Sequence, residues 1–302
     1  MPKFGTFWDG PALGPYEELA LNSFVSARQE IALYSYNRRL EVPMGVKWRD
    51  AHEVLEPNLW QRQLLLDGKY AEFTDFFRLL MMRKTKRVWV DTDIIYLGED
   101  RWGSEYLFAY EDALRVCNAV LRLPRDADLL EDYIIQAETR LARGADSRGP
   151  GGSGPDLLTE LIQKHSLWRI CLSQAAFYPV FYRELWRLFD PKSAGWVIER
   201  TKNSSGLHLW NEFLNYRGLA KKYRPPRGSY LRNLFEELGL ENSLRDMPAM
   251  DPDWPRNIWR RDLWPRRARA RQMIYQGLYP AQRHGPRWLV GTLQRNRQKW
   301  GF

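Results

Sequence analysis

The sequence predicts an α/β fold with a mostly parallel sheet, and two repeated patterns carry this prediction. Apolar runs at residues 6–8 and 31–36 read as strands, and apolar residues recur at helical spacing across residues 17–27 between them. A second helix followed by a strand comes later, with a helical pattern over residues 71–82 before the apolar strand 88–90. Strands that alternate with helices are typical of a parallel sheet covered by helices.

The other elements follow from local patterns. Residues 94–97 form a further apolar run, and apolar spacing indicates helices over 107–121 and 129–142. Glycine and proline dominate residues 149–155, which therefore form a loop, and Asp156 is expected to cap a helix over 157–164.

Composition places the chain among globular proteins without disulfide or membrane-spanning support. It has 302 residues, of which 44% are hydrophobic and 27% charged, and no apolar run approaches the ~20 residues that a membrane span needs. Its two cysteines, Cys117 and Cys171, are too few for a disulfide framework or a thiolate zinc site. The first residues lack the pattern of a secretory signal, so we expect a cytoplasmic protein.

The positive charge is concentrated in the last third of the chain. Residues 215–302 contain 19 Lys and Arg against 7 Asp and Glu, whereas residues 1–214 have a net charge of −3. Tryptophans are interleaved with the arginines there, as in the segment 259–267. Three interpretations stay open for this segment: a solvated helical face, contact with an anionic membrane or the acceptor side, and nucleic-acid binding.

The sharpest chemical signal is Asp91-Thr92-Asp93, directly after the apolar strand 88–90. In an extended backbone, side chains two residues apart point to the same side, so both carboxylates are expected to converge. Two oxygen ligands at the carboxyl end of a strand suit Mg²⁺ or Mn²⁺ carrying a diphosphate. The alternative is a pair of solvated acids at a strand end.

Upstream, Asp75 and Arg78 lie three residues apart on the helix over 71–82, away from its aromatic face. Residues at this spacing are neighbours on a helix surface. Either they form a surface ion pair, or both reach a substrate beside the carboxylates.

These motifs resemble the DXD-containing sugar-binding region of a group of retaining glycosyltransferases, which includes α-1,4-galactosyl- and α-1,4-N-acetylglucosaminyltransferases and the initiating mannosyltransferase type. Phe73-Thr74-Asp75-Phe76-Phe77-Arg78 and the later Val88–Leu97 segment carry the resemblance. Three weaker motifs follow the family order, in Thr6–Gly10, Ser153–Thr159 and His208–Asn211. The chain departs from the family in the segment 84–87, which replaces a Gly-Gly pair.

The resemblance implies a site for a nucleotide-sugar donor. Asp91 and Asp93 are expected to be the catalytic residues. Asp93 is expected to bind the metal that bridges the donor diphosphate, and Asp91 to contact the ribose or sugar, or the metal through a water. Asp75 and Arg78 are expected to hold the donor sugar, and Trp8 to stack on the base. Trp8 is otherwise a core residue.

Further roles are implied in the second half of the chain. His208 is expected to be a second metal ligand or a diphosphate contact, with a buried, hydrogen-bonded histidine as the alternative. Lys202, in the polar segment 201–206, is expected to meet the leaving diphosphate, unless that segment is an ordinary loop. Gly154 and Asp156 are expected to contact the acceptor.

The resemblance also implies the fold and the reaction. We expect a GT-A type, Rossmann-like catalytic domain over residues 1–214, followed by a basic, Trp- and Arg-rich helical segment over 215–302. The expected activity is metal-dependent, retaining transfer of a Gal, Glc or GlcNAc unit from a UDP-linked donor to a saccharide or lipid-linked saccharide acceptor of a surface glycan. The expected cofactor is Mn²⁺ or Mg²⁺, with no nucleic-acid partner.

Two other classes are weighed against it. A phosphatase of the haloacid-dehalogenase type is disfavoured, because Ile95 stands where that pattern needs Thr or Val and the chain has no Gly-Asp pair. The remaining alternative is a basic protein that binds nucleic acid or an anionic membrane without transferase activity.

Overall fold

A computed structural model describes residues 2–98, 101–149, 151–216 and 221–251 of the chain. A six-stranded sheet of order β3-β2-β1-β4-β7-β6 forms its centre. The four strands from β3 to β4 are parallel, whereas β7 runs antiparallel to both β4 and β6. The predicted mixed α/β fold with a mostly parallel sheet is therefore confirmed.

The main strands and helices are bounded as follows. The strands are β1 (Phe4–Phe7), β2 (Ile31–Ser35), β3 (Lys47–Asp50), β4 (Val88–Val90), β5 (Ile94–Tyr96), β6 (Leu107–Tyr110), β7 (Val116–Arg122) and β8 (Gly206–His208). The helices are α1 (Pro15–Ser26), α2 (Leu59–Leu66), α3 (Tyr70–Thr85), α4 (Asp128–Ala142), α5 (Pro155–Lys164), α6 (Ala194–Thr201), α7 (Asn211–Tyr216) and α8 (Tyr230–Glu237).

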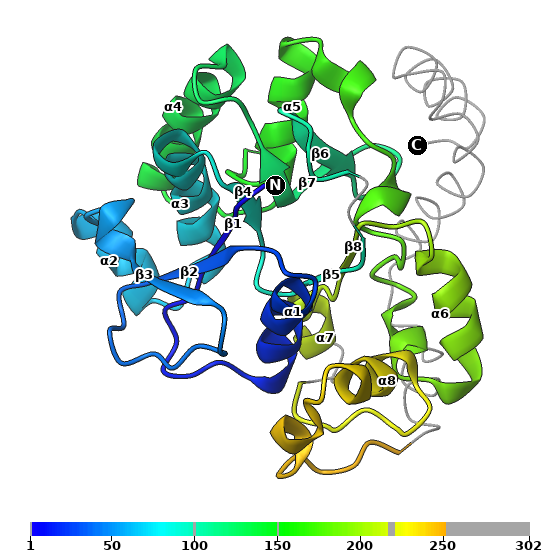
Figure 1. Ribbon diagram of the computed structural model, residues 1–302. Coiled ribbons are helices and arrows are strands. Elements are labelled where there is room, and N and C mark those ends of the chain that lie inside the picture. The colour runs from blue at the N-terminus through cyan, green and yellow to red at the C-terminus, as the bar shows by residue number, and fades with distance from the viewer. Residues whose placement is uncertain (1, 99–100, 150, 217–220, 252–302) are drawn as a thin grey trace.

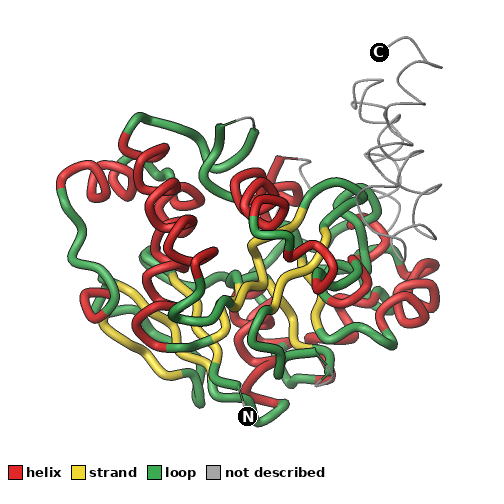
Figure 2. The backbone as a smooth tube through the Cα atoms, turned by 90° about the horizontal axis from the view of Figure 1, so that it is seen from above, coloured by secondary structure: helices red, strands yellow, loops and turns green. Residues whose placement is uncertain are grey.

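Successive side chains along the strands pack alternately in two hydrophobic cores, one on each face of the sheet. Phe4 and Leu33 pack in the core that includes α1, whereas Phe7 and Tyr34 pack in the core that includes α3, α4 and α5. Figure 1 shows α3, α4 and α5 on one side of the sheet and α1 on the other, and Figure 2 shows the strands as an inner layer. Both faces are covered, as a parallel sheet requires.

One predicted helix, over residues 107–121, is wrong. The segment forms the antiparallel strands β6 and β7, joined by a turn in which Asp112 Oδ1 accepts hydrogen bonds from the amides of Leu114 and Arg115. Both strands are buried along almost their whole length without alternation, and such segments suit buried strands as well as they suit helices.

The predicted cap of α5 is also wrong. The helix begins at Pro155, with Gly154 as the N-cap residue, because proline suits the first helical position. Asp156 lies inside the first turn, and its Oδ2 accepts a hydrogen bond from the Gly149 amide at 2.9 Å. The side chain therefore fastens the preceding loop rather than capping the helix.

Residues 221–251 share the core of α1. Tyr230, Leu231 and Phe235 of α8 are buried in it, and the rings of Tyr16 and Phe235 meet edge to face at 5.6 Å. The basic, Trp-rich residues 252–302, with Trp254, Trp259, Trp264, Trp288 and Trp300 as their tryptophans, lie outside the described residues. Among the helices that the structure describes, none combines the length and the apolar character needed to cross a membrane.

Candidate active site

A cavity of about 370 Å³ opens at the carboxyl ends of β1 and β4. This is the edge where open α/β sheets bind ligands, and the volume is in the range of small-molecule pockets. Its lining includes six of the residues singled out in the sequence, which are Trp8, Asp75, Arg78, Asp91, Asp93 and His208.

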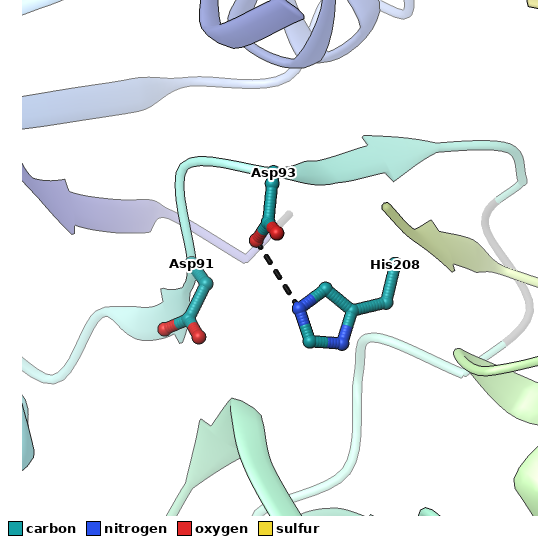
Figure 3. Close-up of side chains that lie close together, drawn as sticks. All are labelled: Asp91, Asp93 and His208. Atoms are coloured by element: carbon teal, nitrogen blue, oxygen red, sulfur yellow. Dashed lines mark ion pairs between the residues drawn. The ribbon is translucent and has the colours of Figure 1, made fainter. Parts of the chain in front are cut away.

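A small second sheet places His208 beside Asp93. Strands β5 and β8 pair antiparallel with Ile94 opposite His208, and Asp93 O accepts a hydrogen bond from the Leu209 amide at 3.0 Å. His208 Nε2 lies 3.2 Å from Asp93 Oδ1, and Figure 3 shows the imidazole facing the carboxylates of Asp93 and Asp91. Residues more than 110 positions apart thus meet because two short strands pair.

Asp91 and Asp93 converge through a turn, not through an extended strand. The amide of Ile94 donates to Asp91 O at 3.1 Å, so the chain reverses directly after β4 and enters β5 in a different sheet. One ligand atom from each of Asp91, Asp93 and His208 lies within 4.8 Å of the others. The expected convergence is present, but the backbone that produces it is a turn.

The two carboxylates have opposite pKa shifts. Burial raises the pKa of Asp91, with the Arg78 guanidinium opposing the shift and the neighbouring Asp93 adding to it. Burial also acts on Asp93, but His208 and the Asn211 amide, which donates to Asp93 Oδ2 at 2.8 Å, hold its pKa below the ordinary value. Asp93 is therefore the carboxylate that this arrangement keeps ionised.

The three side chains suit a divalent cation. Two carboxylates and one imidazole that converge at the edge of a cavity form a donor set of oxygen and nitrogen, which Mn²⁺ accepts readily and Mg²⁺ accepts through oxygen. Asp91 is the more exposed of the two acids, so the group stays open toward the cavity.

Arg78 is buried behind the acids and links them to α3. Its Nη1 donates to Asn118 O at 2.6 Å, and its Nη2 lies 3.4 Å from Asp75 Oδ1 and 3.5 Å from Asp91 Oδ1. Trp89 supports the arrangement from β4, because Nε1 donates to Asp91 Oδ1 at 2.6 Å while the guanidinium lies over the indole. Asp75 and Arg78 are thus not a surface ion pair but a buried one.

Asp75 is held by hydrogen bonds from distant parts of the chain. Its Oδ2 accepts from Ser147 Oγ at 2.6 Å and Ser153 Oγ at 2.9 Å, and its Oδ1 accepts from Asn118 Nδ2 at 2.8 Å. Gly154 lies against the same carboxylate, because an added Cβ would be 2.7 Å from Asp75 Oδ2. The loop before α5 is thereby fixed to the start of α3.

Trp8 lies at the rim of the cavity directly after β1. Its Nε1 donates to Ala12 O at 3.1 Å, and the indole passes close over Gly10, where an added Cβ would be 2.8 Å from Nε1. The ring is half-buried, so it is not a core residue and one part stays accessible.

The structure places three predicted site residues outside the cavity lining. Lys202 follows α6, and its exposed ammonium pairs with Glu199 at 2.7 Å. Gly154 is buried behind Asp75, and Asp156 faces Arg115 and the Gly149 amide. Their expected contacts with diphosphate and acceptor stay predictions.

Two cations that sequence reasoning missed line the cavity. Lys221 forms an ion pair with the buried Glu17 of α1, and burial lowers the pKa of its ammonium to about 8. Arg148 pairs with Glu212 at 3.0 Å and lies over the Phe213 ring. Neither has a local sequence signal, because the chain is rich in arginine and lysine throughout.

A comparison with protein families matches residues 146–236 to the alpha 1,4-glycosyltransferase conserved region. The match covers the part of the cavity wall that contains Ser147, His208, Asn211 and Lys221. The acids after β4 and the pair on α3 lie outside the matched residues.

No curated protein matches the chain. Among solved structures, the PaToxG glycosyltransferase is similar over 56% of this chain and 70% of its own, at 14% sequence identity and a TM-score of 0.44.

Proposed function

Because this chain is a glycosyltransferase that carries the alpha 1,4-glycosyltransferase conserved region, we propose that it transfers a hexose from a UDP-linked donor to a saccharide acceptor with retention. The hexose is of the Gal, Glc or GlcNAc type, and the reaction uses Mn²⁺ or Mg²⁺. The match to this conserved region disfavours the alternative of a binding protein without transferase activity.

One observation carries the proposal: a three-ligand group and buried Arg78 share the wall of one cavity. Asp93 and His208 are the ligands that would hold the ion, with Asp91 completing the group. When bound, such an ion supplies positive charge where the departing diphosphate develops negative charge. Lys221 and Arg148 lie on the same wall, each paired with a glutamate, so the phosphates of a donor would compete with Glu17 and Glu212 for these two cations.

The protein side chains favour attack on the front face of the sugar. A double displacement needs a carboxylate that can reach the sugar, whereas Asp75 is 1% exposed and is held by three hydrogen bonds. In the proposed step, the bond from the anomeric carbon to the β-phosphate oxygen breaks, and the acceptor oxygen bonds to the same face. The acceptor proton passes to the departing phosphate oxygen.

The decisive test is ligand-dependent stabilisation. We expect Mn²⁺ together with UDP, each at about 100 times its Kd, to raise the melting temperature by about 4 °C or more, because one ligand of the folded state at that concentration already stabilises it by about 2.7 kcal/mol. A panel of UDP- and GDP-sugars, with and without EDTA, identifies the base and the metal requirement. If the melting temperature rises equally in EDTA, the proposed metal requirement is wrong. If no nucleotide raises the melting temperature, the proposed nucleotide-sugar donor is wrong.

Trp8 offers a separate test of base binding. Gly10→Ala places a methyl group against the Trp8 indole, so we expect UDP to bind roughly three- to tenfold more weakly through lost stacking. Gly103→Ala is the matched control, because no atom lies within 4 Å of its added Cβ. Isothermal titration calorimetry measures the affinity of each variant for UDP. If the two affinities are equal, the uracil base does not stack on Trp8.

The acceptor and location belong to the same proposal. A saccharide or lipid-linked saccharide of a surface glycan, made on the cytoplasmic side, is consistent with two free cysteines. Contact of the basic segment 252–302 with an anionic membrane stays a prediction, since it lies outside the described residues.

A further inference from the structure

The residues that line the cavity follow the order of the strands at the sheet edge. Trp8 comes directly after β1, Asp93 follows β4, and Asn118 lies in β7. These three strands are neighbours in the order β1-β4-β7, and β7 is antiparallel, so its first residues reach the same edge (Figure 1). A donor that has its base at Trp8 and its diphosphate at the metal ligands therefore directs its sugar toward β7.

Arg148 lies at this β7 end of the cavity. It follows Ser147, whose hydroxyl donates to Asp75, and Asn118 of β7 donates to the same carboxylate. Burial raises the pKa of Glu111, which comes directly after β6, and the positive charge of Arg148 opposes this rise. The guanidinium is therefore near the hairpin of β6 and β7, on the side of the cavity away from Trp8.

Glu212 brings a carboxylate to the same guanidinium from another segment of the chain. It follows Asn211, whose amide donates to Asp93, so the start of α7 is fixed beside the proposed metal ligands. The carboxylate lies 3.0 Å from Arg148 Nη1, and the guanidinium lies over the Phe213 ring, 5.3 Å from its centroid. The ion pair thus joins the loop before α5 to α7 within the cavity wall.

This ion pair leaves most of its hydrogen-bonding capacity unused. Apart from the pair itself, the Arg148 guanidinium and the Glu212 carboxylate make no hydrogen bond to any residue that the structure describes. The two side chains are 37% and 68% exposed, so a ligand in the cavity can reach both. A guanidinium has five N–H donors and a carboxylate has two acceptor oxygens, and hydrogen bonds to charged groups are the stronger ones.

We propose that Arg148 and Glu212 bind a neutral saccharide acceptor through two adjacent hydroxyl groups of its ring, a subsite that rests on the proposed transfer. A hydroxyl both accepts and donates, so one can accept from the guanidinium while its neighbour donates to the carboxylate, and the ion pair stays intact. An acidic or phosphorylated saccharide would have to displace Glu212 from Arg148 and lie beside its negative charge. The pair therefore selects against anionic acceptors.

The test measures binding of saccharides to the full chain by saturation-transfer NMR, with and without Mn²⁺ and UDP. Methyl β-galactoside, methyl β-glucoside and lactose are the neutral probes, and glucuronic acid is the anionic probe. We expect at least one neutral probe to bind, and Arg148→Ala or Glu212→Ala to raise its Kd at least about tenfold through lost charged hydrogen bonds. Glu212→Gln keeps one acceptor oxygen, so its loss of affinity should be smaller.

Arg83→Ala and Glu160→Ala are the matched controls. Each residue belongs to an exposed ion pair outside the cavity lining, Arg83 with Glu131 and Glu160 with Arg140. Their replacement should change the Kd of the saccharide less than about twofold, because such pairs contribute little and do not face the cavity.

The diphosphate of the donor is the rival ligand for Arg148, and Glu212→Ala separates the two. If the phosphates take the guanidinium, its release from Glu212 tightens UDP binding and leaves saccharide binding unchanged, which overturns the proposal. Equal saccharide affinities of the wild type and both alanine variants also overturn it, as does a wild type that binds no neutral probe or prefers glucuronic acid. Calorimetric titration of the wild type with UDP tests the donor by itself, so failure of the proposed transfer is distinguishable from failure of this subsite.

Discussion

Asp93→Asn should lower donor turnover by a factor of at least about 10³, because the proposed site then lacks the charge that holds the metal at the departing diphosphate. Asparagine keeps the shape of the side chain and still accepts the hydrogen bond from the Asn211 amide. We therefore expect the fold to persist, with the free energy of unfolding reduced by about 2 kcal/mol or less. Release of UDP from UDP-hexoses in Mn²⁺ measures the turnover.

A surface carboxylate provides the comparison. Asp132 pairs with Lys164 and His165 on the outside of α4 and α5, away from the cavity, so Asp132→Asn should retain wild-type turnover. If Asp93→Asn turns over donor at the wild-type rate, and EDTA does not slow it, the proposed metal-dependent transfer is wrong. If the circular dichroism spectrum shows that Asp93→Asn is unfolded, His208→Gln replaces it in the test, because this variant removes another ligand of the proposed metal.

Local patterns predicted most elements of the N-terminal half. The N-terminal β-α-β unit, α3, β4 and α4 were found within a few residues of their observed bounds. Strand β3 was missed because it lies at the sheet edge, where Trp48 is its only apolar residue and none of its residues is buried. The hairpin of β6 and β7 was mistaken for a helix because continuous burial removes the alternation that marks a strand.

The candidate site also contains residues that the sequence predicted and contacts that it could not predict. Asp91, Asp93 and His208 belong to motifs that are recognisable along the chain, and the structure brings them together. Ser147 and Ser153 reach Asp75 across 72 and 78 residues, so no local pattern predicts these contacts, although Ser153 begins one of the weaker motifs. Such contacts depend on how the loop before α5 folds back on α3, which only the tertiary structure defines.

Arg78→Met should cost about 3 to 5 kcal/mol in the free energy of unfolding at pH 7, because it removes one partner of a buried ion pair. Arg78 and Asp75 are almost fully buried, so solvent cannot replace the lost guanidinium. Methionine preserves much of the length of the side chain over Trp89. Urea unfolding in EDTA measures the change, and Arg83→Met, at an exposed ion pair with Glu131, should cost less than about 1 kcal/mol.

The pH dependence and a second substitution show whether the cost comes from the stranded charge of Asp75. Burial already raises the pKa of Asp75 above its unfolded value, and loss of Arg78 raises it further. The folded variant then takes up a proton at a higher pH than the unfolded chain, so lowering the pH through the folded pKa should restore part of its stability. Arg78→Met with Asp75→Asn should also be more stable than Arg78→Met alone, since Asp75 then no longer carries a buried, unpaired charge. If the double variant is instead less stable, and the single variant gains nothing between pH 7 and pH 5, Ser147, Ser153 and Asn118 suffice to hold the carboxylate.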